Sequence, residues 1–330
     1  MKNCSIKDLL LSTKTVSKVT INGWVRTFRA NRFIALNDGS SISSVQCVVD
    51  FENFDESILK KINTGTSLEI TGDLVESQGS GQKFEIIVSN LKVLGECDSE
   101  EFPIQPKKHS FEFLRENAHL RTRTNTFSAI MRLRSNLSFA VHNYFNSNGF
   151  YYVHTPIITS SDAEGAGEQF RVTTLDPKSP PLNENSEVDF TKDFFGKETS
   201  LTVSGQLEAE TYAMSLGKVY TFGPTFRAEN SNTSRHLSEF WMIEPEVAFM
   251  DLNGNMDLAE SFLKYLLQYI LQNNIEDLEF LEQRLINEDK TKPQNLRNEM
   301  TLIDKINFVV SNDFMRVSYT EAFEILKNCK

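Results

Sequence analysis

Residues 223–240 read Gly-Pro-Thr-Phe-Arg-Ala-Glu-Asn-Ser-Asn-Thr-Ser-Arg-His-Leu-Ser-Glu-Phe, and apolar residues alternate on either side of this stretch. The alternation predicts two long strands joined by a polar loop. On the first strand Arg227 and Glu229 project from the same face, so a cation and a carboxylate face one pocket. The loop adds Arg235 and His236, and a guanidinium holds phosphate through paired hydrogen bonds. The stretch indicates a polyphosphate site, with an ion-paired surface hairpin as the alternative.

The composition is that of a globular protein with about two domains. The chain has 330 residues, of which 39% are hydrophobic and 24% charged, which excludes a collagen, a coiled coil and a largely disordered chain. It has no stretch of the ~20 apolar residues that a membrane helix needs, and its N-terminus has no apolar core of a secretory signal. The four cysteines form no C-x-x-C pair, so we expect free thiols in a reducing cytoplasm and no membrane partner.

Charge is distributed unevenly along the chain. The net charge is −11, which by itself argues against a nucleic-acid partner. Residues 1–134 nevertheless carry a net charge of +2 and the remainder −13. Because charges are screened over about 8 Å at physiological salt, only local charge meets phosphate. The N-terminal part can therefore bind RNA although the whole chain is acidic.

Residues 18–94 are predicted to form a small all-β module. Apolar and polar residues alternate in five segments, with one short helix between the third and the fourth. The expected strands are 19–25, 32–38, 45–49, 68–74 and 84–88, and the expected helix is 54–62. This is the element order of an OB-fold. A generic small β-barrel is the alternative.

A linker is predicted at 97–109, where Pro103 and Pro106 interrupt a stretch with few apolar residues. It contains Lys107 and Lys108, which we interpret as a solvated part of the linker that could also touch RNA. Arg121 and Arg123 follow it, and a structural or dimer-interface role is open for both.

The remainder alternates between helical and strand patterns, which predicts an α+β domain of antiparallel sheet and flanking helices. Apolar residues recur every three to four positions before Gly149, the expected helix stop. The expected order is helix 125–148, strand 150–155, polar loop 176–192, strands 219–229 and 239–249, and helices 257–284 and 319–326. The predicted domains are 1–96, a linker at 97–124, and 125–330.

Three motifs in order resemble the class II aminoacyl-tRNA synthetases. Residues 223–240 resemble motif 2 of that class, and 149–156 (Gly-Phe-Tyr-Tyr-Val-His-Thr-Pro) resemble motif 1. The Gly-Trp-Val-Arg at 23–26 is similar to the opening strand of the anticodon-binding OB domain in the aspartyl, asparaginyl and lysyl subclass. Residues 193–249 look like a bacterial asparaginyl-tRNA synthetase in particular. The resemblance extends over the whole chain.

The resemblance implies an ATP and adenylate site with Mg²⁺ as the accompanying ion. Arg227 corresponds to the arginine that holds the α-phosphate, and Glu229 is expected near the adenine amino group or an ATP-bound metal. His236 is expected at the outer phosphates and Phe240 on the adenine ring, with Glu239 in the same ATP-binding set. A preplaced cation lowers the barrier of such a reaction without a protein base. No metal ligand is assigned within this chain.

The resemblance also implies an amino-acid pocket. Glu164 corresponds to the glutamate that binds the substrate ammonium, and Ser204 and Gln206 lie in the segment that touches the amino acid. Aspartyl enzymes carry Gln-Leu-x-Lys-Gln here, whereas this chain has Ala209 and Glu210 in the last two positions. A carboxylate accepts a hydrogen bond from the asparagine amide and repels aspartate. Glu210 as an acid that merely stabilises a helix N-terminus is the alternative.

In the OB module the resemblance implies an anticodon-binding face. Phe33 lies where relatives stack a base, Gln46 where they read the central uridine, and Glu85 is a candidate second reader. Arg26 and Arg29 would contact phosphates. Aromatic platforms and base-edge hydrogen bonds are the usual means of holding single-stranded RNA. For Phe33, a place in the barrel core is the alternative.

The expected activity is that of an asparagine–tRNA ligase, which joins L-asparagine to tRNA(Asn) through asparaginyl-adenylate. Motif 1, ending at Pro156, implies a homodimer, and the expected location is cytoplasmic. No Gly-x-Gly-x-Gly-x-x-Arg pattern of motif 3 occurs in 251–330. We therefore expect a partial catalytic domain that is inactive, or nearly so, alone. The alternatives are an aspartyl or non-discriminating synthetase, an RNA-binding protein on a degenerate synthetase scaffold, and, with less support, an asparagine synthetase.

Overall fold

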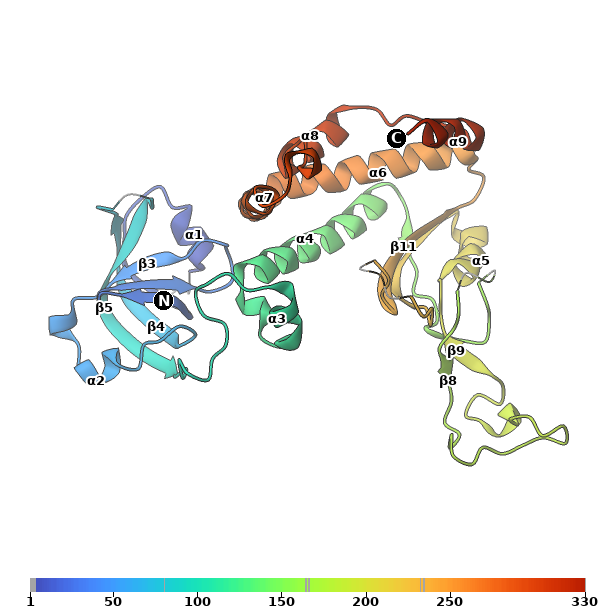
Figure 1. The fold of residues 1–330 in the computed structure, drawn as a ribbon, viewed down its shortest axis with the longest axis horizontal. Coiled ribbons are helices and arrows are strands. Elements are labelled where there is room, and N and C mark those ends of the chain that lie inside the picture. The colour runs from blue at the N-terminus through green and yellow to red at the C-terminus, as the bar shows by residue number, and fades with distance from the viewer. Residues whose placement is uncertain are drawn as a thin grey trace. The chain divides into compact units, whose positions relative to one another are not determined.

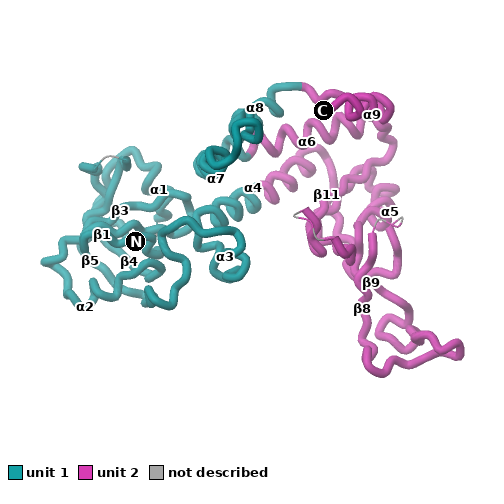
Figure 2. Tube along the Cα trace, viewed as in Figure 1, with its two compact units in different colours: residues 1–136, 270–312 teal, residues 137–269, 313–330 magenta. Residues whose placement is uncertain are grey.

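The computed structural model describes residues 4–79, 81–163, 165, 167–231, 233 and 235–329. Its contacts divide the chain into two compact units, which Figure 2 distinguishes by colour. Unit 1 comprises residues 1–136 and 270–312, and unit 2 comprises 137–269 and 313–330. The chain thus leaves unit 1, builds most of unit 2, and returns to unit 1 before it ends in unit 2.

Unit 1 contains a closed five-stranded barrel, shown in blue to cyan in Figure 1. Its strands are β1 (Val16–Arg29), β2 (Phe33–Asn37), β3 (Val45–Val48), β4 (Ser67–Glu76) and β5 (Phe84–Gly95). The strand order around the barrel is β1-β2-β3-β5-β4. Two short helices, α1 (Ile6–Leu10) and α2 (Glu56–Leu59), accompany the strands. A helix between the third and fourth strands is the predicted OB-fold order.

The barrel core follows from the period of two in its strands. Ile34, Leu36, Cys47 and Ile86 are fully buried in one apolar cluster. The residues between them point to the outside, because successive side chains on a strand project from opposite faces. Phe33 is only half-buried and is not part of that cluster. The alternative that Phe33 belongs to the barrel core is therefore wrong.

A β-bulge interrupts the pairing of β1 with β2. Val25 pairs with Leu36 and Thr27 pairs with Ala35, so Arg26 is the extra residue between two paired ones. A bulge re-aims the side chain of the inserted residue. The regular pairing of the strand is therefore interrupted at Arg26.

Helices complete unit 1. They are α3 (Phe111–Glu116), the first part of α4 (Asn125–Ser147), α7 (Ile275–Asp289) and α8 (Leu302–Ser311). Arg132 of α4 forms a largely buried ion pair with Asp277 of α7 at 2.7 Å. The pairing joins segments that are far apart in the sequence.

The prediction of one helix over 257–284 is wrong. The structure has two helices, α6 (Leu252–Asn273) and α7, separated at Asn274. Asn274 is buried, and its side-chain amide donates to Asp277 at 3.2 Å and accepts from Asn136 at 2.7 Å. An asparagine that hydrogen-bonds locally and to a neighbouring helix offers its backbone an alternative to the helix, which explains the break.

Unit 2 is built on a three-stranded sheet of order β11-β10-β6. Its strands are β6 (Tyr151–Tyr152), β10 (Lys218–Phe226) and β11 (Glu239–Val247), and β10 pairs antiparallel to β11 over its whole length. A second small sheet contains β7 (Ile158–Thr159), β8 (Arg171–Val172) and β9 (Thr199–Leu201). The predicted strand 150–155 is regular only over β6. Helices α5 (Gln206–Leu216) and α9 (Tyr319–Asn328) also belong to this unit.

One face of the β10–β11 sheet carries the apolar core of unit 2. Tyr220 stacks on Phe145 of α4 with ring centroids 4.5 Å apart. Ile243 and Val247 of β11 pack against the same cluster, together with Phe262 of α6. Because successive side chains on a strand project from opposite faces, the residues between these apolar ones form the second face of the sheet.

Two further findings concern the described residues as a group. None of their helices is both long and apolar enough for a membrane span. All four cysteines lie in the described ranges, and each is a free thiol, as predicted.

Candidate functional site

The second face of the β10–β11 sheet carries the chemistry-bearing side chains. Thr225 pairs with Phe240 and Thr221 with Glu244. Paired residues share a face, so these side chains and Met242 line one surface. Arg227 follows β10 in the same alternation. This surface faces away from the apolar core described above.

Arg227 and Glu229 lie on the same side of their segment. A Cβ atom added to Gly167 would be 3.0 Å from Cδ of Arg227 and 3.2 Å from a carboxylate oxygen of Glu229, so both side chains reach that glycine. The amide of Ala228, between them, donates to the Glu168 carbonyl at 2.7 Å. A side chain at position 167 would push into both groups. The glycine therefore allows the backbone to approach the aliphatic stem of Arg227 and the carboxylate of Glu229 closely.

The guanidinium of Arg227 has few protein partners. Its Cζ lies 5.3 Å from the centre of the Phe240 ring, and one terminal nitrogen lies 4.0 Å from the Met242 sulfur. Its Nε is buried and has no hydrogen-bond partner. Within the described part of the chain, no ion pair involves Arg227. A buried donor without a partner is costly, and an anion placed here would satisfy both the charge and the N–H.

The other predicted nucleotide contacts are more scattered. His236 is exposed in the loop, where its Nδ1 hydrogen-bonds the Thr233 hydroxyl. Glu239 pairs with Phe226 at the end of β11, on the face of the sheet opposite Phe240. Glu164 lies outside the described residues. The structure brings Arg227, Glu229 and Phe240 together and leaves Glu239 apart from them.

Sequence reasoning missed Glu244, which anchors the other end of this surface. Its carboxylate accepts hydrogen bonds from the Ser204 hydroxyl, from the amide of Gly205 at 3.2 Å and from the Thr221 hydroxyl at 2.9 Å. Three donors hold a carboxylate in a fixed orientation. The sequence did contain a signal for this residue. Glu244 follows Phe240 by four positions on one strand, and residues an even number of positions apart project from the same face.

The predicted amino-acid residues surround the start of α5. Gln206 is its first residue, and its side-chain amide donates to Glu210 at 3.1 Å. Burial, together with the nearby carboxylates of Glu210 and Glu244, raises the pKa of Glu246 to about 7. Ala209 is fully buried beside Val219 in the core between helix and sheet. Three acidic side chains and an amide therefore share this corner of unit 2.

The outer face of the barrel gathers most of the predicted anticodon residues. Gln46 pairs with Ala35 on one side and with Glu85 on the other. The Gln46 amide donates to a carboxylate oxygen of Glu85 at 3.1 Å, and the Ser77 hydroxyl donates to the same oxygen at 2.9 Å. Phe33 lies two residues along the strand from Ala35, on the same face. The result is a ring beside an amide and a carboxylate.

The two predicted phosphate-binding arginines differ in position. Arg29 is exposed and pairs with Phe33, which places it on the same outer face. Arg26, in the bulge, instead donates to the backbone carbonyl of Arg123. The sequence gives no sign of this difference, because the bulge is set by strand pairing.

Fold and site together define a class II tRNA synthetase that carries an OB-fold barrel. Residues 110–330 match the family described as tRNA synthetases class II (D, K and N), and residues 19–94 match the OB-fold nucleic acid binding domain. These matches confirm the predicted fold class.

Individual relatives narrow the class. The chain is 56% identical to the asparagine–tRNA ligase of Cytophaga hutchinsonii and 54% identical to that of Borreliella burgdorferi, over 99% of its own length and 68% and 69% of theirs. The asparaginyl-tRNA synthetase of Pyrococcus horikoshii, solved with asparaginyl-adenylate, superimposes with a TM-score of 0.75 at 26% identity, over 100% of this chain and 69% of that one. The chain belongs to the asparagine–tRNA ligases.

Proposed function

We propose that the protein activates L-asparagine with ATP and transfers it to tRNA(Asn). The observation that carries this proposal is the surface on unit 2, where the unpaired guanidinium of Arg227 lies beside an aromatic ring at one end and the Ser204–Glu244 pair closes the other end. A cation and a ring suit the phosphate and base of an adenylate. An orienting carboxylate suits the polar groups of an amino acid.

The reaction follows from where charge develops. The carboxylate of asparagine attacks the α-phosphorus of ATP, a new carboxyl–phosphate bond forms, and pyrophosphate leaves with the electron pair of the broken bond. Negative charge grows on the oxygens of the α-phosphoryl group, where Arg227 is placed to stabilise it. A ribose hydroxyl of the tRNA 3′ end then attacks the activated carbonyl and releases AMP. The first step needs no protein base.

Mg²⁺ stays a proposal as the ion that accompanies the phosphates of ATP. Across the described ranges no three His, Cys, Asp or Glu side chains are grouped so as to hold a metal ion.

Preference for asparagine over aspartate is proposed to arise from the acidic corner of Glu210, Glu244 and Glu246. Burial, with a further contribution from the carboxylates of Glu210 and Glu244, raises the pKa of Glu246 to about 7. A fourth carboxylate, from aspartate, would add to the repulsion among these groups, whereas the amide of asparagine can donate to a carboxylate. Discrimination by unpaired buried charge is stronger than discrimination by shape alone.

Recognition of tRNA(Asn) is proposed for the outer barrel face. Phe33 offers a ring for stacking, and Gln46 and Glu85 offer donors and acceptors for a base edge. The hydrogen bond between Gln46 and Glu85 holds both side chains in place before RNA arrives. Arg29 supplies charge on the same face.

A homodimer through motif 1 is also proposed. Within motif 1, Tyr151 and Tyr152 form β6 and are each about half exposed, and so is Trp241 of β11. Large exposed apolar groups gathered on one unit are typical of protein–protein contacts. Sedimentation of the protein over a range of concentrations tests this proposal.

The activity is tested by calorimetric titration with non-hydrolysable sulfamoyl analogues of asparaginyl-adenylate and aspartyl-adenylate. This measurement requires no turnover. We expect the asparaginyl analogue to bind at least about 100-fold more tightly, since repelling a buried charge is worth several kcal/mol. Equal binding of the two analogues would indicate a non-discriminating enzyme. Binding of neither would leave only the RNA-binding alternative.

A further inference from the structure

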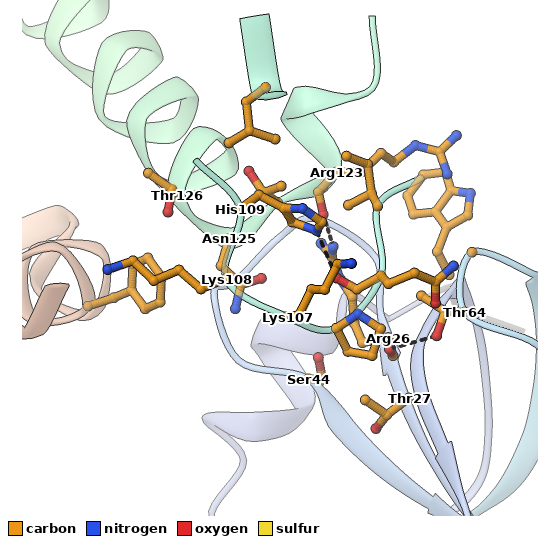
Figure 3. A pocket seen from close by; sticks show the side chains of 18 of the residues that line it. Arg26, Thr27, Ser44, Thr64, Lys107, Lys108, His109, Arg123, Asn125 and Thr126 are labelled. Carbon is orange, nitrogen blue, oxygen red and sulfur yellow. Dashed lines mark hydrogen bonds between the residues drawn. The ribbon is translucent and has the colours of Figure 1, made fainter. Parts of the chain in front are cut away.

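A pocket of about 670 Å³ lies within unit 1, apart from every residue proposed above for catalysis. Strand β1 forms one wall, the segment from Phe102 to His109 a second, and the N-terminus of α4 with α7 a third. Figure 3 shows the polar side chains around it. A volume of this size is typical of small-molecule sites.

The charged side chains that line this pocket are all basic. Arg26, Lys107, Lys108 and Arg123 line it, and no aspartate or glutamate does. Among the described residues, none of these four side chains takes part in an ion pair. Arg284 also borders the pocket, but Glu288 pairs with it at 3.1 Å. A concave site with several unneutralised cations attracts an anion.

Arg26, which lies at the bulge in β1, is the least exposed of these four cations. One terminal nitrogen donates to the Arg123 carbonyl, while its Nε is buried without any hydrogen-bond partner. Burial, with the neighbouring cations Arg123 and Arg132, lowers the pKa of Arg26. A buried guanidinium that faces other cations is unfavourable until an anion offsets its charge.

Aromatic and aliphatic side chains line another part of the pocket. Cζ of Arg123 lies 5.7 Å from the centre of the Trp24 ring and 5.9 Å from that of Phe102. Leu114 and Phe280 add apolar wall. Cations beside aromatic platforms are the combination that holds a nucleotide, with phosphate on the cations and the base against the rings.

We propose that this pocket binds a phosphorylated nucleoside. Arg26, Lys107 and Lys108 hold the phosphate, and Trp24 and Phe102 pack against the base. The ligand is either a free nucleotide or one nucleotide of a bound RNA. If the ligand is a nucleotide of a bound RNA, the proposal rests on the proposed tRNA function; if it is a free nucleotide, it does not. The solvated linker expected around Lys107 and Lys108 thereby acquires a binding role.

Uridine 5′-monophosphate is the probe, because a pyrimidine avoids competition with adenine recognition at Arg227. Calorimetric titration should show saturable binding that is stronger than that of uridine or inorganic phosphate. The double substitution K107Q/K108Q should weaken binding about tenfold or more. Both lysines are exposed, so the fold should not change. Trp24→Leu should reduce the preference for the nucleotide over inorganic phosphate.

The matched controls are Lys60→Gln, an exposed barrel lysine paired with Glu56, and Arg227→Ala. Neither should alter binding of the probe. Competition between the probe and tRNA would identify an RNA nucleotide as the ligand, and independent binding would identify a free nucleotide. No saturable binding up to about 10 mM, an affinity too weak for a specific site, overturns the proposal. So does equal binding by K107Q/K108Q. Failure of adenylate-analogue binding alone would refute the proposed function and leave this site standing.

Discussion

At the scale of single residues, the candidate site depends on one unsatisfied guanidinium. Arg227 is held by packing against Phe240 and Gly167, and its buried Nε lacks an acceptor. A pre-positioned donor loses little freedom when its ligand arrives, so its full interaction goes into binding. The carboxylate of Glu244, at the other end of this surface, is in contrast held by three protein donors.

Replacing Arg227 with alanine should weaken binding of the asparaginyl-adenylate analogue by about 10- to 100-fold, the cost of losing a charge-assisted hydrogen bond. Calorimetric titration measures this change. The control is Arg115→Ala, which removes an exposed arginine paired with Glu112 and should have no effect. Unchanged affinity in the Arg227 variant would exclude it from the phosphate site.

The raised pKa of Glu246 gives a pH prediction with a definite sign. Its folded-state pKa of about 7 lies above the ordinary value of 4.5. Stability from the protonated carboxyl is therefore full below about pH 4.5 and is lost as pH rises toward 7, since the unfolded chain gives up this proton first. Glu246→Gln should flatten the fall in melting temperature between pH 5 and 8. Parallel profiles for variant and wild type would contradict the assignment.

At the scale of elements, the barrel strands contain irregularities in their pairing that the alternation of apolar and polar residues does not predict. The bulge in β1 falls at Arg26, one of the residues that line the pocket of unit 1. A second register shift lies between Thr71 and Gly72, where β4 approaches β5. Bulges of this kind bend a strand, and barrels use them to close.

Gly72→Ala should destabilise the barrel strongly. An added Cβ would lie 2.1 Å from the carbonyl oxygen of Ile87, which is backbone and cannot rotate away. We expect a loss of at least about 1–3 kcal/mol, the usual cost of overpacking. Denaturant unfolding followed by the fluorescence of Trp24 provides the measurement. Gly79→Ala is the control, because its nearest atom would be 3.6 Å away, and it should be nearly neutral.

At the scale of the whole molecule, an acidic protein retains a net-positive part, which contains the face proposed to bind RNA. The net charge is −11, whereas residues 1–134 are net positive. Screening over about 8 Å confines each charge to its neighbourhood. The acidic remainder therefore weakens RNA binding little at physiological salt.

This arrangement predicts different salt responses for two charge changes. Arg29→Gln, on the outer barrel face, should lower the slope of log affinity for tRNA against log salt by about 1. Glu184→Gln, an exposed acid in unit 2, should leave the slope unchanged. Filter binding from low to moderate salt measures both. A similar change in both variants would mean that net charge, rather than local charge, governs binding.

Features that depend on residues close together in the sequence were predicted better than features that depend on contacts between distant residues. The five barrel strands and helices α4 and α9 were predicted in their correct places, because hydrophobic periodicity is local, although β1 and β5 extend beyond the expected 19–25 and 84–88. The break at Asn274 was missed, since it depends on hydrogen bonds to Asn136 and Asp277. Motifs identified Arg227 and Gln206 as candidates, but Glu244 belongs to the site through strand pairing.

The sequence by itself determined the alternation of the strands, the order of the motifs and membership of the synthetase class, because these depend on residue type and spacing along the chain. Only the tertiary structure decided that Glu244 joins Ser204, that a bulge falls at Arg26, and that Lys107 and Arg123 share a pocket with Trp24. Pairing register and long-range packing bring together residues that no local pattern connects.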